Sequence, residues 1–171
     1  MYRGLPAVCT EAILLPRTVV RRLRNAAERQ GISLEEYLLE VLSQDLDPRD
    51  RAREYIEAAE ELLERARIEL GKGDVRQAAE KAWGAAALAV KAYAYWRDGK
   101  RLTSHGELWG YTTVLRKELG KWVYSAWNAG QAMHTCFYEG WCSQEHVEHA
   151  LEEIEKLVKS VKERIRAGDA E

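Results

Sequence analysis

The sequence of 171 residues lacks any long apolar run, since no segment approaches the roughly 18 residues that a helix needs to cross a bilayer. The N-terminal stretch MYRGLPAVCTEAILLP does not have the layout of a signal peptide, because Glu11 interrupts its apolar part. Proline is scarce and glycine is modest, with 3 and 12 residues, which excludes a collagen-like or low-complexity chain. The 3 cysteines are odd in number and show no pairing pattern. We therefore expect buried thiols in a cytoplasmic protein.

Charge of one sign is not in excess. Lys and Arg number 26 against 28 Asp and Glu, so the net charge of −2 excludes a molecule that is basic throughout. Asparagine occurs only as Asn25 and Asn128, whereas charged residues make up 32% of the chain. Few thermolabile amides beside many ion-pairing residues are typical of a thermophile.

Residues 1–47 are predicted to form a strand followed by two helices. The only strand candidate is VCTEAILL, residues 8–15. Gly31 has the position of a C-terminal glycine that ends the first helix. Ser33 and Glu36 have the spacing of a capping box, which begins the second.

Residues 48–171 are predicted to form an all-α, antiparallel bundle of about five helices joined by short loops. The small side chains of residues 75–96 favour a central position for that helix, because neighbouring helices can approach it closely. The expected helices cover 54–70, 75–96, 104–119, 121–138 and a last segment that begins at Ser143.

The run TEAILLPRTVVRRLRNAAERQGISLEEYLLEVLSQ resembles the ribbon-helix-helix pattern of antitoxins and repressors through Leu15-Pro16 and Gly31-Ile32-Ser33. The resemblance implies a homodimer, because a single strand cannot satisfy its hydrogen-bond ladder alone. It also implies that outward strand residues read DNA. Those residues are Thr10, Ala12 and Leu14, of which only the threonine can donate a hydrogen bond to a base edge.

The first helix is basic. Five arginines against one glutamate give residues 16–30 a charge of +4. The candidates for phosphate contact are Arg17, Arg21, Arg22 and Arg24. The alternative is an ordinary solvated helix face.

Residues 50–165 resemble the archaeal PaREP family, which is found in thermophilic archaea. The resemblance is carried by AAEELLERARIELGKGDVRQAAEKAWGAAALAVKA (58–92), SHGELW (104–109) and HTCFYEGW (134–141). It implies an all-helical fold related to HEPN domains and a family of unsettled activity.

HEPN ribonucleases carry an Arg-x(4–6)-His motif on one helix, often followed by a tyrosine. The histidine can move a proton of a ribose hydroxyl, and the arginine stabilises charge on the phosphate. His134 and Tyr138 match this pattern, but the positions for the arginine hold Trp127, Asn128 and Ala129. We therefore expect no HEPN-type ribonuclease activity.

The candidate pocket consists of His134, Tyr138, Asn128 and His105. The alternative for His134 is a partly buried histidine in an aromatic-rich helix. The alternative for His105 is that it orders the turn after Ser104. Side chains that can join the pocket are Glu80, Lys81, Trp83 and Glu139.

His146 and His149 are three residues apart, near Cys136 and Cys142. Such spacing can place two imidazoles on one helix face for zinc, but the cysteine spacing matches no standard zinc motif. We expect neither a metal nor a cofactor.

These observations predict a non-catalytic, homodimeric helical module that binds a partner protein or nucleic acid, as in toxin–antitoxin systems. We expect it in the cytoplasm and away from membranes. Two alternatives stay open. One is a divergent HEPN-type ribonuclease that uses His134, and the other is a ribbon-helix-helix repressor.

Overall fold

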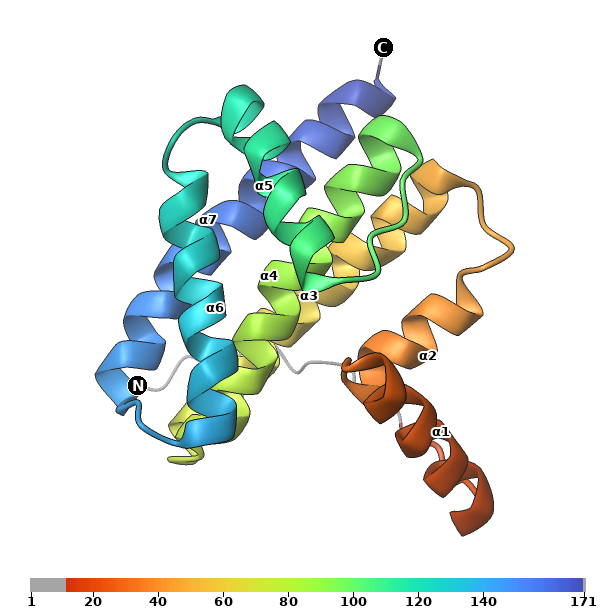
Figure 1. The fold of residues 1–171 in the computed structure, drawn as a ribbon, viewed down its shortest axis with the longest axis vertical. Helices are drawn as coiled ribbons and strands as arrows, with labels where there is room; N and C mark the ends of the chain where they lie inside the picture. The colour runs from red at the N-terminus through yellow and green to blue at the C-terminus, as the bar shows by residue number, and fades with distance from the viewer. Residues whose placement is uncertain (1–11, 171) are drawn as a thin grey trace, which may run out of the picture.

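The computed structural model describes residues 12–170, and within them all regular secondary structure is helical (Figure 1). The prediction of an all-α protein is therefore confirmed. Seven helices are present over this range. The first two lie before residue 48, and the other five form the bundle. None of them is long and apolar enough to span a membrane. The helices are α1 (Arg17–Gln30), α2 (Leu34–Leu42), α3 (Pro48–Gly71), α4 (Val75–Asp98), α5 (His105–Leu119), α6 (Val123–Glu139) and α7 (Gln144–Asp169).

Helix α4 is the centre of the bundle and packs against α3, α5, α6 and α7 (Figure 1). Its many alanines are buried, so neighbouring helices can approach it from several sides. Helix α6 lies close to α4: a Cβ atom built at Gly130 would lie 2.9 Å from the Cβ of Ala86. This close crossing brings the side chains of α6 that flank Gly130 against α4.

The strand expected at residues 8–15 is not found. Residues 12–15 form no strand, and residues 8–11 lie outside the described residues. A strand exists only through hydrogen bonds to a neighbouring strand, and the neighbour that the resemblance implies belongs to a second copy. The two helices of this segment do form. Gly31 ends α1 in the left-handed conformation, with φ of 67°.

The capping box expected at the start of α2 is only half formed. The Ser33 hydroxyl accepts a hydrogen bond from the Glu36 backbone N–H at 3.1 Å, as predicted. The Glu36 carboxylate does not reach back to Ser33, because it pairs with Lys91 of α4. A tertiary contact has replaced the local one.

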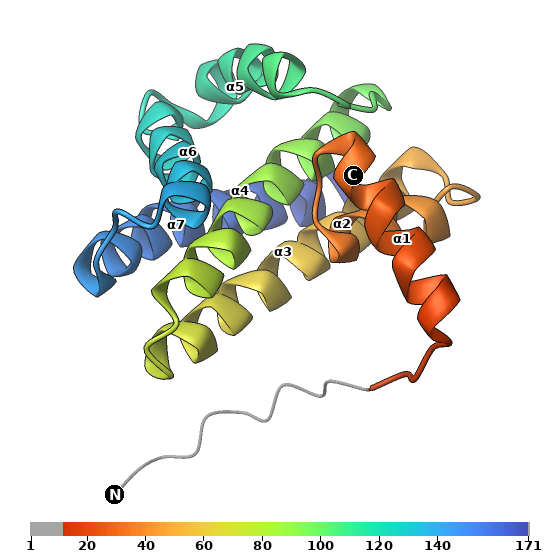
Figure 2. The ribbon, with the colours of Figure 1, turned by 60° about the horizontal axis from the view of Figure 1, so that its bottom comes forward.

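Helix α2 holds the N-terminal arm, which we define as residues 12–47, on the bundle. Three of its carboxylates meet cations of the bundle: Glu35 with Lys81, Glu36 with Lys91, and Glu40 with Arg101. The Ser43 carbonyl also accepts a hydrogen bond from Arg51 Nε at 2.8 Å. Helix α1, in contrast, projects beyond the bundle in both views (Figures 1 and 2).

Candidate functional site

Two histidines from different helices meet at one tryptophan. The ring centroids of His105 and His134 are 4.9 Å apart. The ring centroid of Trp83 lies 5.4 Å from that of His105 and 4.8 Å from that of His134. Helix α5 begins at His105 because a complete capping box fixes its first turn. His134 faces α4 from α6, and Tyr138, one turn further on, stacks edge-on against it at 5.2 Å. The structure thus brings three of the four expected pocket residues together.

The fourth residue, Asn128, lies elsewhere. It is exposed on α6, six residues before His134, which is about 240° further round the helix. Of the further candidates, Glu80 and Trp83 line the same cavity as His134, whereas the exposed Glu139 does not.

A cavity of about 70 Å³ lies beside His134. Helices α4 and α6 form two of its walls, and the α1–α2 turn of the arm forms the third. Its lining residues are Gly31, Ile32, Ser33, Glu36, Glu80, Trp83, Gly84, His134, Phe137 and Tyr138. Pockets for drug-sized ligands measure about 300 Å³ or more, so this one is too small for a nucleotide.

Two ionisable groups of the cavity, His134 and Glu80, have shifted pKa values. Burial lowers the pKa of His134 from 6.5, and repulsion from His105 lowers it further, so the imidazole is neutral at pH 7. Burial raises the pKa of Glu80 above 4.5, against the smaller opposing effect of Lys81. A neutral imidazole and a weakened acid in one cavity are the groups that proton-transfer chemistry uses.

A cation for a phosphate group is missing. None of the described residues that line the cavity is a lysine or an arginine. The nearby Lys81 pairs with Glu35, at 2.7 Å between Nζ and Oε1. Of the three positions that a HEPN arginine can take, Trp127 is fully buried and Asn128 is exposed.

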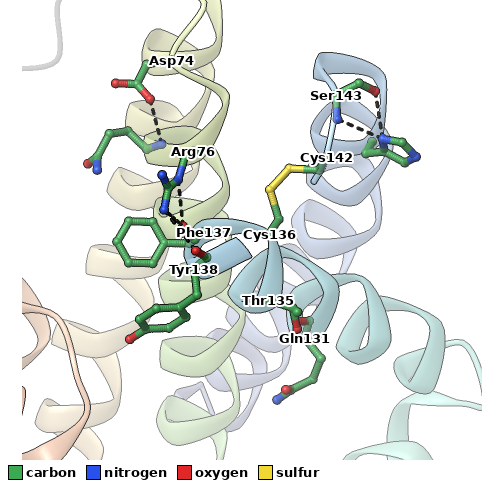
Figure 3. Close-up of a disulfide and its surroundings, with 11 residues drawn as sticks. Asp74, Arg76, Gln131, Thr135, Cys136, Phe137, Tyr138, Cys142 and Ser143 are labelled. Atoms are coloured by element: carbon green, nitrogen blue, oxygen red, sulfur yellow. Dashed lines mark hydrogen bonds between the residues drawn. A yellow bond between two sulfur atoms is a disulfide. The ribbon is translucent and has the colours of Figure 1, made fainter. Parts of the chain in front are cut away.

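Arg76 instead supports the end of α6. It donates hydrogen bonds to the carbonyl of Phe137 at 2.9 and 2.7 Å and to that of Tyr138 at 3.2 Å. These carbonyls belong to the last turn of the helix and have no partner within it. Figure 3 shows the guanidinium beside this turn, with both aromatic side chains pointing away from the disulfide. The sequence contains no signal for this contact, because 61 residues separate the partners.

The expectation of buried thiols is wrong for two cysteines. Cys136 and Cys142 form a disulfide, with their Cα atoms 5.6 Å apart (Figure 3). The chain reverses at Gly140, which adopts the left-handed conformation and brings the two residues within bonding range. The disulfide joins the end of α6 to the start of α7.

The remaining candidates lie away from the cavity. Arg17, Arg21, Arg22 and Arg24 are exposed on α1, and no ion pair between described residues involves them. His146 caps α7, with Nδ1 accepting a hydrogen bond from the Ser143 N–H at 3.0 Å. Residues 12–170 hold no group of three or more metal-ligating side chains.

Residues 54–158 match the model of the archaeal PaREP1/PaREP8 family. The chain belongs to this family. The matched region begins within α3 and ends within α7, so this PaREP1/PaREP8 region contains the histidine cluster but not α1 and α2.

A solved structure resembles part of the molecule. A protein from Sulfolobus solfataricus, known from a crystal structure, is 26% identical to this PaREP1/PaREP8 chain with a TM-score of 0.56. The similarity covers 62% of this chain and 94% of that one. A comparison with curated proteins found no match.

Proposed function

We propose that the protein is a non-catalytic helical binding module that forms a homodimer through its N-terminal arm. The observation that carries this proposal is the distribution of exposed aliphatic side chains. Among residues 12–170, every large aliphatic residue that is exposed belongs to the arm. They are Ile13, Leu14, Leu15, Val19, Val41, Leu42 and Leu46.

Such a surface favours a second copy. Apolar area removed from water contributes about 25 cal/mol per Å², and Leu14 and Leu42 alone are 97% and 75% exposed. Around a two-fold axis the same patch on two copies covers itself. Residues 13–15 would then gain the strand partner that one chain does not supply.

The non-catalytic part of the proposal is supported by the cavity at His134. Its volume is about 70 Å³, one of its walls is the docked arm, and its described lining holds no cation for a phosphate. An enzyme acting on RNA would need both space for a nucleotide and compensation of the phosphate charge.

Light scattering on the intact chain tests the dimer. We expect a mass of twice 19.6 kDa for the wild type and of one chain for Leu14→Ser/Leu42→Ser. The matched control is Tyr124→Ser, which removes an exposed apolar side chain from the bundle and should stay dimeric. A monomeric wild type would overturn the proposal, and a dimeric double variant would place the interface outside the arm.

A second candidate function is a divergent HEPN-type ribonuclease. It is favoured by the separation of 4.9 Å between the rings of His105 and His134, because two imidazoles can divide the roles of general base and general acid. The RNA-cleavage experiment in the Discussion decides between the two candidates.

A further inference from the structure

We propose that the cavity between α4, α6 and the α1–α2 turn is a binding site for a small organic cation, namely a primary ammonium or guanidinium head group. This site needs no second copy of the chain, so it is independent of the proposed dimer.

Aromatic rings form much of the cavity wall. Trp83 comes from α4, and Phe137 and Tyr138 come from the last turn of α6. The centroids of Phe137 and Tyr138 are 5.1 Å apart, and the His134 ring lies between Trp83 and Tyr138, at 4.8 and 5.2 Å. A cation within about 6 Å of the face of an aromatic ring is attracted by its negative quadrupole, and the guanidinium of Arg76 already lies 6.0 Å from the centroid of Phe137.

The charges of the lining residues are those that a cation requires. Glu36 and Glu80 are the ionisable acids of the lining, and lysine and arginine are absent from its described residues. Lys91 already pairs with Glu36. Glu80 has no comparably close partner: Lys81 Nζ lies 3.9 Å from its carboxylate but 2.7 Å from that of Glu35. Glu80 is therefore the acid available to a ligand.

The imidazole does not oppose a cation at neutral pH. His134 stays uncharged because burial and the adjacent His105 lower its pKa. The pKa of Glu80 is raised mainly by burial, so an incoming ammonium group would stabilise the carboxylate that burial disfavours.

The size of the cavity limits the ligand to a head group. A cavity of about 70 Å³ has room for one ammonium or guanidinium group with its first carbon, and not for a whole drug-sized ligand. Tyr138 and Gly31 are exposed at the rim, and the rest of a ligand can extend past them into solvent.

Two contacts hold the end of α6 in place. Arg76 takes up the free carbonyls of Phe137 and Tyr138, and the Cys136–Cys142 disulfide holds the turn that follows. Both contacts fix the backbone that carries the two rings (Figure 3), and both residues line the cavity. The site is preorganised on the side of α6.

The test is a titration of the full-length protein with methylammonium chloride, followed by NMR of the tryptophan indole N–H groups and assigned with Trp83→Phe. Sodium chloride at equal ionic strength and methanol are the reference solutes. We expect the Trp83 signal to shift saturably with methylammonium alone. Glu80→Gln should weaken binding by about tenfold, whereas Glu139→Gln, at an exposed site outside the cavity, should not.

A second arm of the titration uses a short peptide with a single lysine. Tighter binding of the peptide than of methylammonium identifies a partner's side chain as the source of the head group, and equal binding identifies a free amine. The proposal is overturned if methanol shifts the Trp83 signal equally, if no solute shifts it, or if Glu80→Gln and Glu139→Gln weaken binding alike.

Discussion

His134 loses solvent and comes within contact of a second imidazole when the chain folds, so its protonation is coupled to folding. Its pKa is lowered in the native state, mainly by burial, whereas the unfolded chain keeps a value near 6.5. As the pH falls through this value, His134 takes up a proton more readily in the unfolded chain than in the native one, so the free energy of unfolding decreases.

We predict that the free energy of unfolding decreases as the pH is lowered from 7.5 to 5.5, and that His134→Gln flattens this dependence. Urea unfolding across the pH range measures it. Glu80 has the opposite effect at lower pH. Its pKa is raised in the native state, so its protonation increases the free energy of unfolding as the pH falls. His149→Gln, at an exposed position of α7, is the control. A slope that His134→Gln leaves unchanged would contradict the prediction.

Catalysis at the same histidine is predicted to be absent. Purified protein should not cleave a fluorogenic RNA above background in the presence of a chelator, because the loss of one charge-stabilising contact commonly lowers the rate by ~10²–10³. His134→Ala is the control. Cleavage by the wild type that disappears in His134→Ala would support the ribonuclease candidate instead, with Arg76, Arg101 and Arg116 as the next residues to replace.

Part of this site follows from the sequence. The spacing of His134 and Tyr138 places them one turn apart on a helix, which is where the structure has them. The approach of His105 depends on how α5 crosses α6. The wall formed by the α1–α2 turn depends on ion pairs between residues about 50 positions apart, and no local pattern contains that information.

At the scale of elements, the sequence predicts a helix end where local residues decide that end. Gly31 ends α1, and α5 begins directly after Ser104, where the sequence predicts a helix start. The sequence does not predict structure that depends on a distant partner. Residues 12–15 form no strand, and the Glu36 side chain pairs with Lys91 instead of completing the capping box of α2. Local chemistry therefore predicts the helices, and contacts across the molecule decide what lies between and beside them.

The Glu36–Lys91 pair is predicted to hold α2 on α4. Both side chains are nearly buried, at 8% and 7% exposure. Glu36→Ala leaves an uncompensated buried charge and should lower the free energy of unfolding by about 3 kcal/mol, whereas Glu36→Gln/Lys91→Met should recover most of the loss.

Urea unfolding of both variants measures the effect. Glu60→Ala breaks the more exposed pair with Lys162 and should lower the free energy by no more than about 1 kcal/mol. An equal loss in Glu36→Ala and Glu60→Ala would mean that the buried pair does not fix the arm.

At the scale of the whole molecule, charge is divided unevenly. Residues 16–30 carry +4 in a chain of net charge −2, so the remainder carries −6. The positive charge lies on α1, which projects from the bundle (Figure 2). The exposed arginines of this helix are therefore a basic surface that a polyanion can contact.

We predict that any binding to duplex DNA is independent of sequence and falls steeply with salt. Each phosphate contact contributes about 0.9 to the slope of log K against log salt, so Arg21→Ala/Arg24→Ala should reduce the slope by about two. Fluorescence anisotropy with two unrelated duplexes measures this. Arg164→Ala/Arg166→Ala on α7 should leave the slope unchanged. Binding to one defined operator that survives moderate salt would instead support the repressor alternative.

The Cys136–Cys142 bond closes a ring of only a few residues at the junction of α6 and α7. That ring contains Phe137, Trp141 and Tyr138, and the last is 64% exposed. A chymotrypsin cut inside it would sever the polypeptide without separating the halves. The nicked protein should run as one band on a denaturing gel until reductant is added, and then as two.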